Sequence, residues 1–317
     1  RKDCKVFSES NAIMTAVSDE KGYFEFGNIP YGEYVVREIK APRGYILSNK
    51  SYPVSISEDG EVIEITAENK PITVEISKRD VYGNELVGAE MVLENADGET
   101  VDKGTSDGTN HIVSKLGAGE YVLKEIAAPD GYVIATDIKF NVDVYGNVTV
   151  ENVDSTAVSD NGDPLITMVD DTTKVQISKQ DITTGEELPG ATLQIIDEDG
   201  NVVEERVSTN EPHMIEGKLI AGKKYTLKEI IAPEGYEIAN EIKFTVNADG
   251  TVTEVVMYDE LTPDLETPPT VIIDIPHTGV SADNSAELYL VATAVIMVFG
   301  MVICKRNGKE QRKDDVK

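Results

Sequence analysis

The chain has 317 residues, of which 40% are hydrophobic, and a formal net charge of −29. A protein that binds nucleic acid needs a basic face to neutralise phosphates, so this charge argues against a nucleic-acid partner. The length allows about two to three domains. The sequence begins at Arg1, within a repeat and without an initial methionine, so we expect the N-terminus of the protein to lie further upstream.

Three nearly identical phrases recur along the chain, and we call each of them a glutamate box. They read YVVREIKAPRGY at 34–45, YVLKEIAAPDGY at 121–132 and YTLKEIIAPEGY at 225–236. Each places a glutamate inside an alternating apolar pattern, where an unpaired buried carboxylate would be costly. The three residues concerned are Glu38, Glu125 and Glu229. Because this unfavourable placement occurs three times, the three glutamates are expected to share a role.

Strand-like phrases surround each box. After the boxes come the alternating segments 52–65, 138–150 and 242–255, each centred on a turn such as Asp59-Gly60 or Asp249-Gly250 that favours a β-hairpin. No long stretch has the 3.6-residue period of a helix. The pattern predicts an all-β protein built of sandwich modules of about 90–100 residues.

The repeats set the expected domain boundaries. We predict a first module over 1–70 that lacks its opening strand, a second over 71–171 and a third over 172–260. A proline-rich linker follows at 261–274, and 275–317 forms a terminal segment of a different kind. The second module carries an extra stretch near 151–164, which we interpret as a surface loop insertion.

The C-terminus combines three features in a fixed order. The pentapeptide IPHTG at 275–279 precedes an apolar run at 288–304, and Lys305 and Arg306 follow the run. The apolar run is long enough for a single C-terminal transmembrane helix, and the basic residues would hold the tail in the cytoplasm. The arrangement resembles the cell-wall sorting signal of Gram-positive surface proteins, Leu-Pro-any-Thr-Gly, with Ile275 in place of leucine.

This resemblance implies a substrate of sortase. The motif residues are Ile275, Pro276, His277, Thr278 and Gly279. A sortase cysteine would attack the carbonyl of Thr278, release Gly279 and the rest of the tail, and pass the chain to an amine of a peptidoglycan precursor or of a pilin subunit. The protein would then be extracellular and covalently attached to the wall, with the membrane as a partner only before sorting.

The phrases before Glu260 resemble the collagen-adhesin B-type (Cna-B, or SpaA-like) domains of Gram-positive pilins and adhesins. The motifs that carry the likeness are an opening Lys-x-Asp, then Gly-Ala, then the glutamate box. The resemblance implies tandem prealbumin-like, Ig-like β-sandwich modules. It also implies an intramolecular isopeptide bond between a lysine of the first strand and an Asn or Asp of the last, promoted by the box glutamate.

Carried onto this sequence, the resemblance gives two complete triads. Asn69 precedes Lys78 by nine residues and Asp170 precedes Lys179 by the same nine, so both acyl residues fall at a module junction. The predicted triads are Lys78–Glu125–Asp170 and Lys179–Glu229–Asp259. The first module keeps Glu38 and Asn69, and we expect its lysine before Arg1, because no Gly-Ala phrase follows Lys2 or Lys5.

The second module leaves an alternative for the acyl residue. Asn152 lies 27 residues after Glu125, close to the 31 residues from Glu38 to Asn69 and the 30 from Glu229 to Asp259, whereas Asp170 lies 45 residues after. We favour Asp170, because its surroundings match those of Asp259 better.

The chemistry explains the residue types. Burial favours the neutral amine of lysine, which can attack, and a protonated carboxylic acid, which can polarise the target carbonyl and move a proton. The reaction occurs once per molecule, so we do not expect an enzyme. His111, His213 and His277 are scattered in what we interpret as loops and in the sorting peptide, without zinc spacing, and we expect no metal or cofactor.

We therefore predict the structural stalk of a wall-anchored adhesin or pilin-like protein. Two other functions stay open on the sequence alone. The chain could be the anchoring tail of an extracellular enzyme whose catalytic domain lies upstream, or a module that binds a host or extracellular-matrix protein, with the insertion as its binding loop. No Tyr-Pro-Lys motif of polymerised pilins occurs in these residues.

Overall fold

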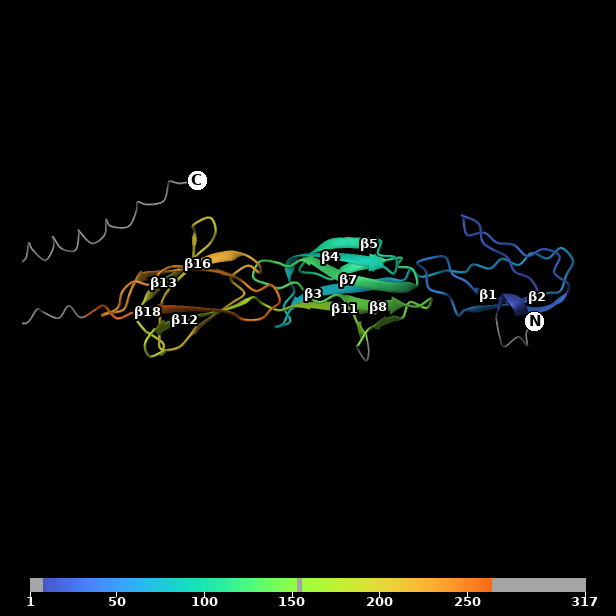
Figure 1. Ribbon diagram of the computed structural model, residues 1–317. Coiled ribbons are helices and arrows are strands. Elements are labelled where there is room, and N and C mark those ends of the chain that lie inside the picture. Colours follow the sequence, from blue (N-terminus) through green and yellow to red (C-terminus); the bar gives the residue numbers. More distant parts are fainter. Residues whose placement is uncertain (1–7, 153–155, 264–317) are drawn as a thin grey trace, which may run out of the picture. The chain divides into compact units, whose positions relative to one another are not determined.

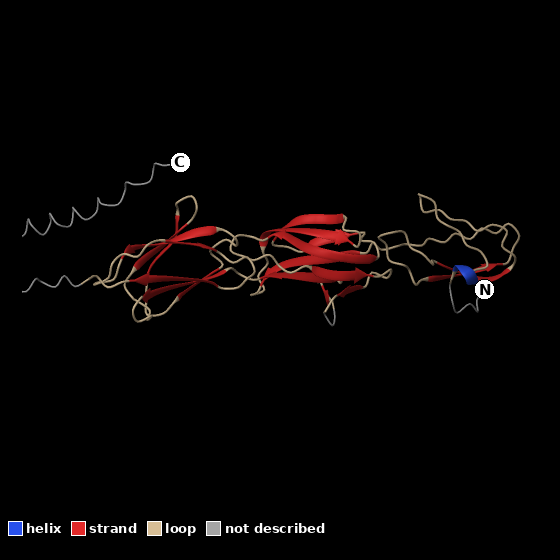
Figure 2. Cartoon of the chain, in the orientation of Figure 1, coloured by secondary structure: helices blue, strands red, loops and turns tan. Residues whose placement is uncertain are grey.

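The computed structural model describes residues 8–152 and 156–263 (Figure 1). Within these ranges every regular element except the one-turn 3-10 helix η1 (Glu9–Asn11) is a β-strand, which confirms the all-β prediction (Figure 2). No helix of the described ranges is long and apolar enough to cross a membrane. The predicted membrane helix at 288–304 lies outside them, as does most of the linker.

The second module is a sandwich of two sheets, in the strand orders β10-β11-β3-β6 and β5-β4-β7-β8-β9. The last strand, β11, runs parallel to the first, β3, with Met168 opposite Lys78. The strands are β3 (Thr73–Asp80), β4 (Val87–Asn95), β5 (Thr100–Asp107), β6 (His111–Ser114), β7 (Gly119–Ala127), β8 (Ile138–Val142), β9 (Val148–Val150), β10 (Ala157–Val158) and β11 (Pro164–Asp170).

The third module repeats this plan with fewer strands. Its sheets have the orders β15-β12-β18 and β14-β13-β16-β17, and the last strand again lies parallel to the first, with Met257 opposite Lys179. Figure 1 shows β12 and β18 in one layer and β13 and β16 in the other. The strands are β12 (Lys174–Asp181), β13 (Thr192–Ile196), β14 (Val202–Val207), β15 (His213–Glu216), β16 (Lys224–Ile231), β17 (Ile242–Thr245) and β18 (Thr253–Asp259).

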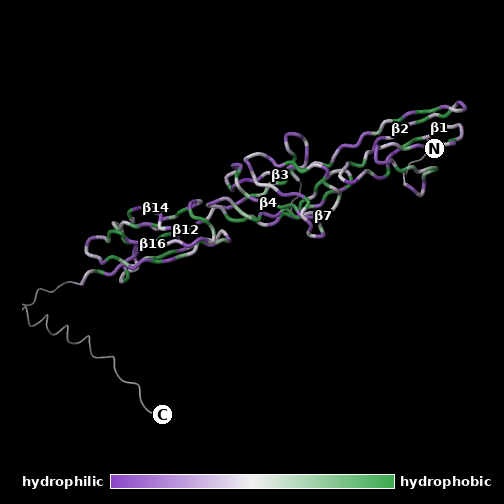
Figure 3. Tube along the Cα trace, turned by 90° about the horizontal axis from the view of Figure 1, so that it is seen from above, coloured by the Kyte–Doolittle hydropathy of each residue, from purple (hydrophilic) through white to green (hydrophobic). Residues whose placement is uncertain are grey.

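Each of these two modules has its own hydrophobic core between its sheets. Burial alternates along strands such as β7 and β18, because successive side chains of a strand point to opposite faces. Figure 3 shows hydrophobic and hydrophilic residues interspersed along the chain. The first residue of each box takes part: Tyr121 stacks on Phe140 with ring centroids 5.5 Å apart, and Tyr225 stacks on Phe244 at 5.9 Å.

The first module contains two described strands, β1 (Gly32–Arg37) and β2 (Ser51–Ile56), which pair antiparallel. Strand β1 carries the first box, as β7 carries the second. Strand β7 is flanked by β4 and β8, whereas in the described residues β1 has only β2 beside it. Tyr34 and Val36 are therefore only half-buried, while their counterparts Tyr121 and Leu123 are buried.

The hairpin expected after each box forms only in the second module, where β8 pairs with β9. In the third module the prediction is wrong, because the strand after Asp249-Gly250 is β18, which pairs with β12 in the opposite sheet. In the first module no strand follows Asp59-Gly60 over 57–70. The turn residues are compatible with a hairpin. In the third module, however, the strand after the turn is β18, the last strand of the module, and it pairs with the first strand, β12.

Candidate functional site

Three ionisable side chains of the second module meet inside its core. The Nζ atom of Lys78 contacts Oδ1 of Asp170 and lies 3.1 Å from Oε1 of Glu125. All three side chains are buried, and Lys78 is only 1% exposed. Lys78 and Asp170 come from neighbouring strands of one sheet, β3 and β11, while Glu125 comes from β7 of the facing sheet. The triad therefore joins the two layers of the sandwich.

The third module holds the same arrangement. The Nζ atom of Lys179 contacts Oδ1 of Asp259 and lies 3.2 Å from Oε1 of Glu229. Lys179 is 2% exposed, and both carboxyl side chains are fully covered. The structure thus brings together both sets of three residues that the sequence placed in triads.

Alternation and strand pairing explain how the lysine reaches the core. Val74, Ile76 and Lys78 share one face of β3, and the first two pack in the core. In the parallel pair, Asp170 lies two residues beyond Met168, the partner of Lys78, and so on the same face of the sheet. The lysine stem packs like an apolar side chain, while its amino group needs polar partners.

A backbone hydrogen bond fixes each box glutamate. The N–H of Ala135 donates to Oε2 of Glu125 at 2.6 Å, and the N–H of Ala239 donates to Oε2 of Glu229 at 2.7 Å. In both cases the donor lies ten residues after the glutamate. The bond occupies one carboxylate oxygen and leaves the other, Oε1, facing the lysine. Sequence reasoning missed this contact, because a backbone donor leaves no residue-type signal.

Burial shifts the proton equilibrium of one carboxyl group in each triad. Burial raises the pKa of Asp170 to about 7, with a further contribution from neighbouring Glu125, although Lys78 opposes the shift. Burial likewise raises the pKa of Glu229. Among the described residues, Oδ2 of Asp170 and Oδ2 of Asp259 are buried without a hydrogen-bond partner. One cation and two carboxyl groups in an apolar core favour retention of a proton, because full ionisation would bury a net negative charge.

The first module brings together the two residues assigned to it. The side-chain amide of Asn69 donates to both carboxylate oxygens of Glu38 at 2.9 Å, and the N–H of Ser48 donates to Oε2 of Glu38 at 2.9 Å. Ser48 lies ten residues after Glu38, as Ala135 lies after Glu125. Both Glu38 and Asn69 are half-buried. Lys2 and Lys5 lie outside the described residues.

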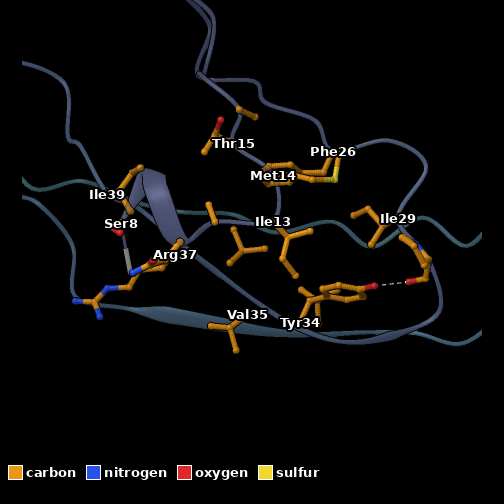
Figure 4. Close-up of a pocket in the computed structure, with 16 residues that line it drawn as sticks. Ser8, Ile13, Met14, Thr15, Phe26, Ile29, Tyr34, Val35, Arg37 and Ile39 are labelled. Atoms are coloured by element: carbon orange, nitrogen blue, oxygen red, sulfur yellow. Dashed lines mark hydrogen bonds between the residues drawn. The ribbon is translucent and has the colours of Figure 1, made fainter. Parts of the chain in front are cut away.

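An apolar cavity of about 180 Å³ opens beside β1. Figure 4 shows Ile13, Met14, Phe26 and Tyr34 around it, with the hydroxyl of Tyr34 donating to the carbonyl of Pro30 at 2.7 Å. The cavity has no charged centre comparable to the two triads. Its wall includes the half-buried residues Tyr34 and Val36 of β1.

Asn152 and Asp170, the two alternatives in the second module, occupy different environments. Asn152 is exposed just after β9, with a left-handed backbone (φ 60°), whereas Asp170 is buried against Lys78. Between them the insertion folds back onto β3. Buried Glu75 accepts hydrogen bonds from Ser159 at 2.8 Å and Asn161 at 2.9 Å, so this part of the insertion is docked.

The aspartate of each Lys-x-Asp motif has a separate role. Oδ1 of Asp80 accepts the N–H groups of Tyr82 and Asn84 at 2.9 and 2.8 Å, and thereby closes the turn after β3. Asp181 closes the equivalent turn after β12 and accepts the hydroxyl of Tyr236, the last box residue, at 2.7 Å. The motif therefore combines a triad lysine with a turn-forming carboxylate.

The interpretation of two histidines as loop residues is wrong, because both lie on strands. His111 begins β6 with Nε2 2.6 Å from Asp102 on β5, and His213 begins β15 with Nε2 2.7 Å from Glu204 on β14. Each pair links the two sheets of its module. Across the described ranges, no group of three or more His, Cys, Asp and Glu side chains is placed to hold a metal ion. His277 and the rest of the sorting pentapeptide lie outside those ranges.

Comparison with known proteins gives one family match. The model of the SpaA prealbumin-like fold domain matches residues 2–71, 72–156 and 173–261. No curated protein matches the sequence. Similar solved structures include the Bacillus anthracis TIE protein (28% identity, TM-score 0.40), with 80% of this chain and 47% of that one aligned, so the chain spans about half the length of that protein.

Two other solved structures come from Lactobacillus rhamnosus GG. The shaft pilin SpaA is 14% identical, with a TM-score of 0.27 over 60% of this chain and 97% of that one. The open conformation of the pilus adhesin SpaC is 17% identical, with a TM-score of 0.36 over 67% of this chain and 36% of that one. The family assignment depends on the sequence match, because all three TM-scores lie below 0.5.

Proposed function

Because the chain belongs to the family of SpaA prealbumin-like fold domains, we propose that it is the structural stalk of a sortase-anchored cell-surface protein, an adhesin or a pilin-like subunit. Its modules would be stabilised by autocatalytic isopeptide bonds. One observation supports the cross-links above all: Lys78, Glu125 and Asp170 converge in a buried site, and Lys179, Glu229 and Asp259 repeat it.

The reaction joins the lysine amine to the aspartate carboxyl group. Neutral Nζ of Lys78 attacks Cγ of protonated Asp170, a C–N bond forms, one C–O bond breaks, and water leaves. The raised pKa of Asp170 supports the protonated form of the target, because a carboxylic acid is a better acyl donor than a carboxylate. No oxidant or cofactor is required for this condensation.

Glu125 is the proton carrier in this scheme. Its Oε1 lies 3.1 Å from the amine and its Oε2 is held by Ala135, so the carboxyl group can accept a proton from the attacking nitrogen and return one to the departing oxygen. Glu125 ends the reaction as it began. Glu229 has the same role in the third module. In the first module, Glu38 and Asn69 are two of the three residues of an equivalent site, and bond formation at Asn69 would release ammonia instead of water.

The mechanical benefit follows from the position of the bonds. Each links the first strand of a module to the last, so a force pulling along the chain passes through the cross-link and the strands between carry little load. Closing a long loop also lowers the entropy of the unfolded chain. Both effects suit a chain that is anchored at one end and pulled at the other.

The mass of the intact full chain tests the cross-links. Two Lys–Asp bonds predict a loss of two waters, about 36 Da, relative to the sequence mass. Tandem mass spectrometry after proteolysis should recover Lys78 joined to Asp170 and Lys179 joined to Asp259. A chain with the unmodified mass would show instead that the triads are buried charge networks without a bond.

Sortase anchoring is tested separately, in a Gram-positive host that carries a sortase. The native chain should appear in the wall fraction released by a muramidase, with Thr278 as its last residue. Thr278→Ala should keep the chain in the membrane fraction, because the scissile site is lost, while Ser281→Ala just beyond the pentapeptide should have no effect. Equal wall attachment of both variants would contradict this part of the proposal.

A further inference from the structure

The turn that ends each glutamate box contains a glycine at a left-handed backbone position. Gly44, Gly131 and Gly235 have φ values of 84°, 85° and 87°. A side chain at any of the three would be strained to a similar degree. Their surroundings nevertheless differ, and this difference shows how one module meets the next.

The first two glycines lie against the backbone of the following module. A Cβ atom on Gly44 would lie 2.4 Å from the carbonyl oxygen of Lys115, and one on Gly131 would lie 2.2 Å from that of Gly217. Both distances are far below a van der Waals contact. No described atom lies within 4 Å of the position that a Cβ on Gly235 would take. Only glycine therefore fits at the two internal junctions.

The residues that present these carbonyl groups are also equivalent to each other. Lys115 follows β6 with φ 61°, and Gly217 follows β15 with φ 65°. Asn28 has φ 55° at the corresponding place of the first module. A lysine rarely adopts this conformation, because its Cβ is crowded there, so the surrounding structure must hold it in place.

Hydrogen bonds at both junctions follow a similar path, although the loop donor is one residue later at the first junction than at the second. The N–H of Ile72 donates to the carbonyl of Gly44 at 2.9 Å, and the N–H of Leu116 donates to the carbonyl of Ile72 at 3.2 Å. At the second junction Thr173 donates to Gly131 at 2.9 Å, and Gly217 donates to Thr173 at 3.0 Å. The first strand of each module is thus bonded to the preceding turn and to its own loop.

We propose that the box glycine and the left-handed residue of the next module form a docking seat that couples neighbouring modules. The partner that fits the seat is another module of this family, presenting the carbonyl group of the loop after its β6-type strand. The seat of the third module, at Gly235, has no such loop against it among the described residues. The proposal does not depend on the cross-links, since no triad residue takes part.

Gly131→Ala tests the seat, and Gly235→Ala is its matched control. Both variants place a Cβ at the same backbone conformation, but only the first meets a carbonyl oxygen. Spin labels at Asn141→Cys and Lys228→Cys, both exposed, would report the distance between the second and third modules in the full chain with Cys4 and Cys304 changed to serine. Pulsed electron paramagnetic resonance measures the distance distribution.

We expect a narrow distribution in the native chain and in Gly235→Ala. In Gly131→Ala it should broaden by about two-fold or more, because relative motion of domains is the default once their interface is lost. A distribution that is broad in the native chain, or equally narrow in both variants, would overturn the proposal.

A folding defect would not hide the answer. If backbone strain alone unfolds a module, Gly131→Ala and Gly235→Ala will lose circular dichroism to the same extent, and the added clash then has no consequence, which contradicts the seat. Gly44→Ala, labelled across the first junction, gives a second and independent measurement. It should broaden that distance distribution and leave the one across the second junction narrow.

Discussion

Glu125→Gln should prevent the cross-link of the second module and leave that of the third intact. Glutamine has the shape of glutamate and can accept the hydrogen bond of Ala135, but it cannot carry a proton between Lys78 and Asp170. Removal of one carboxyl group also leaves one amine and one carboxyl group together, so no unpaired charge is created in the core. The fold should therefore survive the substitution.

The magnitude follows from the loop that the bond closes. Lys78 and Asp170 are 92 residues apart. The loop-closure entropy for a cross-link of that span corresponds to about 4.6 kcal/mol at 25 °C. A module of about 100 residues changes its melting temperature by about 4 °C per kcal/mol, so the second module should melt about 20 °C lower in the variant.

Intact mass spectrometry and differential scanning calorimetry of the full chain measure the two effects. The variant should show the loss of one water in place of two, and one of the calorimetric transitions should shift down. Glu120→Gln, on the exposed face of the same strand, is the control and should change neither. A Glu125→Gln chain that still loses two waters would refute the role of Glu125. A lost bond without a lower transition would refute the loop-closure argument.

Three further outcomes are expected. Asp259→Asn should give the same final mass as the native chain, because Asn loses ammonia and Asp loses water to form the same amide with Lys179. Asp259→Ala cannot form this bond, so its mass should show the loss of one water in place of two. An Asp259→Asn chain without the bond would contradict the assignment of Asp259. In Lys78→Met, which cannot form the bond, burial and neighbouring Glu125 hold the pKa of Asp170 above its ordinary 3.8 and no lysine opposes them, so the folded module keeps a proton that the unfolded chain releases. Denaturant titrations should therefore show the stability of this variant falling as pH rises above 3.8, and a stability that increases with pH would contradict the raised pKa. Glu75→Ala should speed proteolytic cleavage of the insertion by about ten-fold or more, because it removes the acceptor of Ser159 and Asn161. Gln176→Ala, at the equivalent position of the third module, which has no insertion, should leave the rate unchanged.

The sequence patterns were sufficient to predict the class of fold, and together with the family resemblance they nominated the members of the candidate triads. Alternation with period 2 and the absence of a 3.6-residue period predict strands, because these are the geometric periods of the two structures. Repetition then singled out Glu125 and Glu229, since a carboxylate in an apolar pattern stands out when it recurs. Equal spacing of the junction residues did the same for Asp170.

Some features could not be predicted, because they depend on contacts between distant segments. The residues Asp249-Gly250 favour a hairpin, yet β18 does not pair with the preceding strand, β17. It joins the opposite sheet, where it pairs with β12. His111 and His213 looked like loop residues, because the acids that they meet lie on other strands. The insertion looked like a free loop, because the carboxylate of Glu75 that holds it lies far back in the sequence.

Residue type and spacing determined which side chains face the core of this protein, because the face of a strand is a local property. Only the tertiary structure decided which of them meet. Lys78 and Asp170 are brought together by parallel pairing of the first and last strands, and Glu125 is turned toward them by the N–H of Ala135. Pairing and orientation of this kind depend on closure of the whole module, which no local pattern encodes.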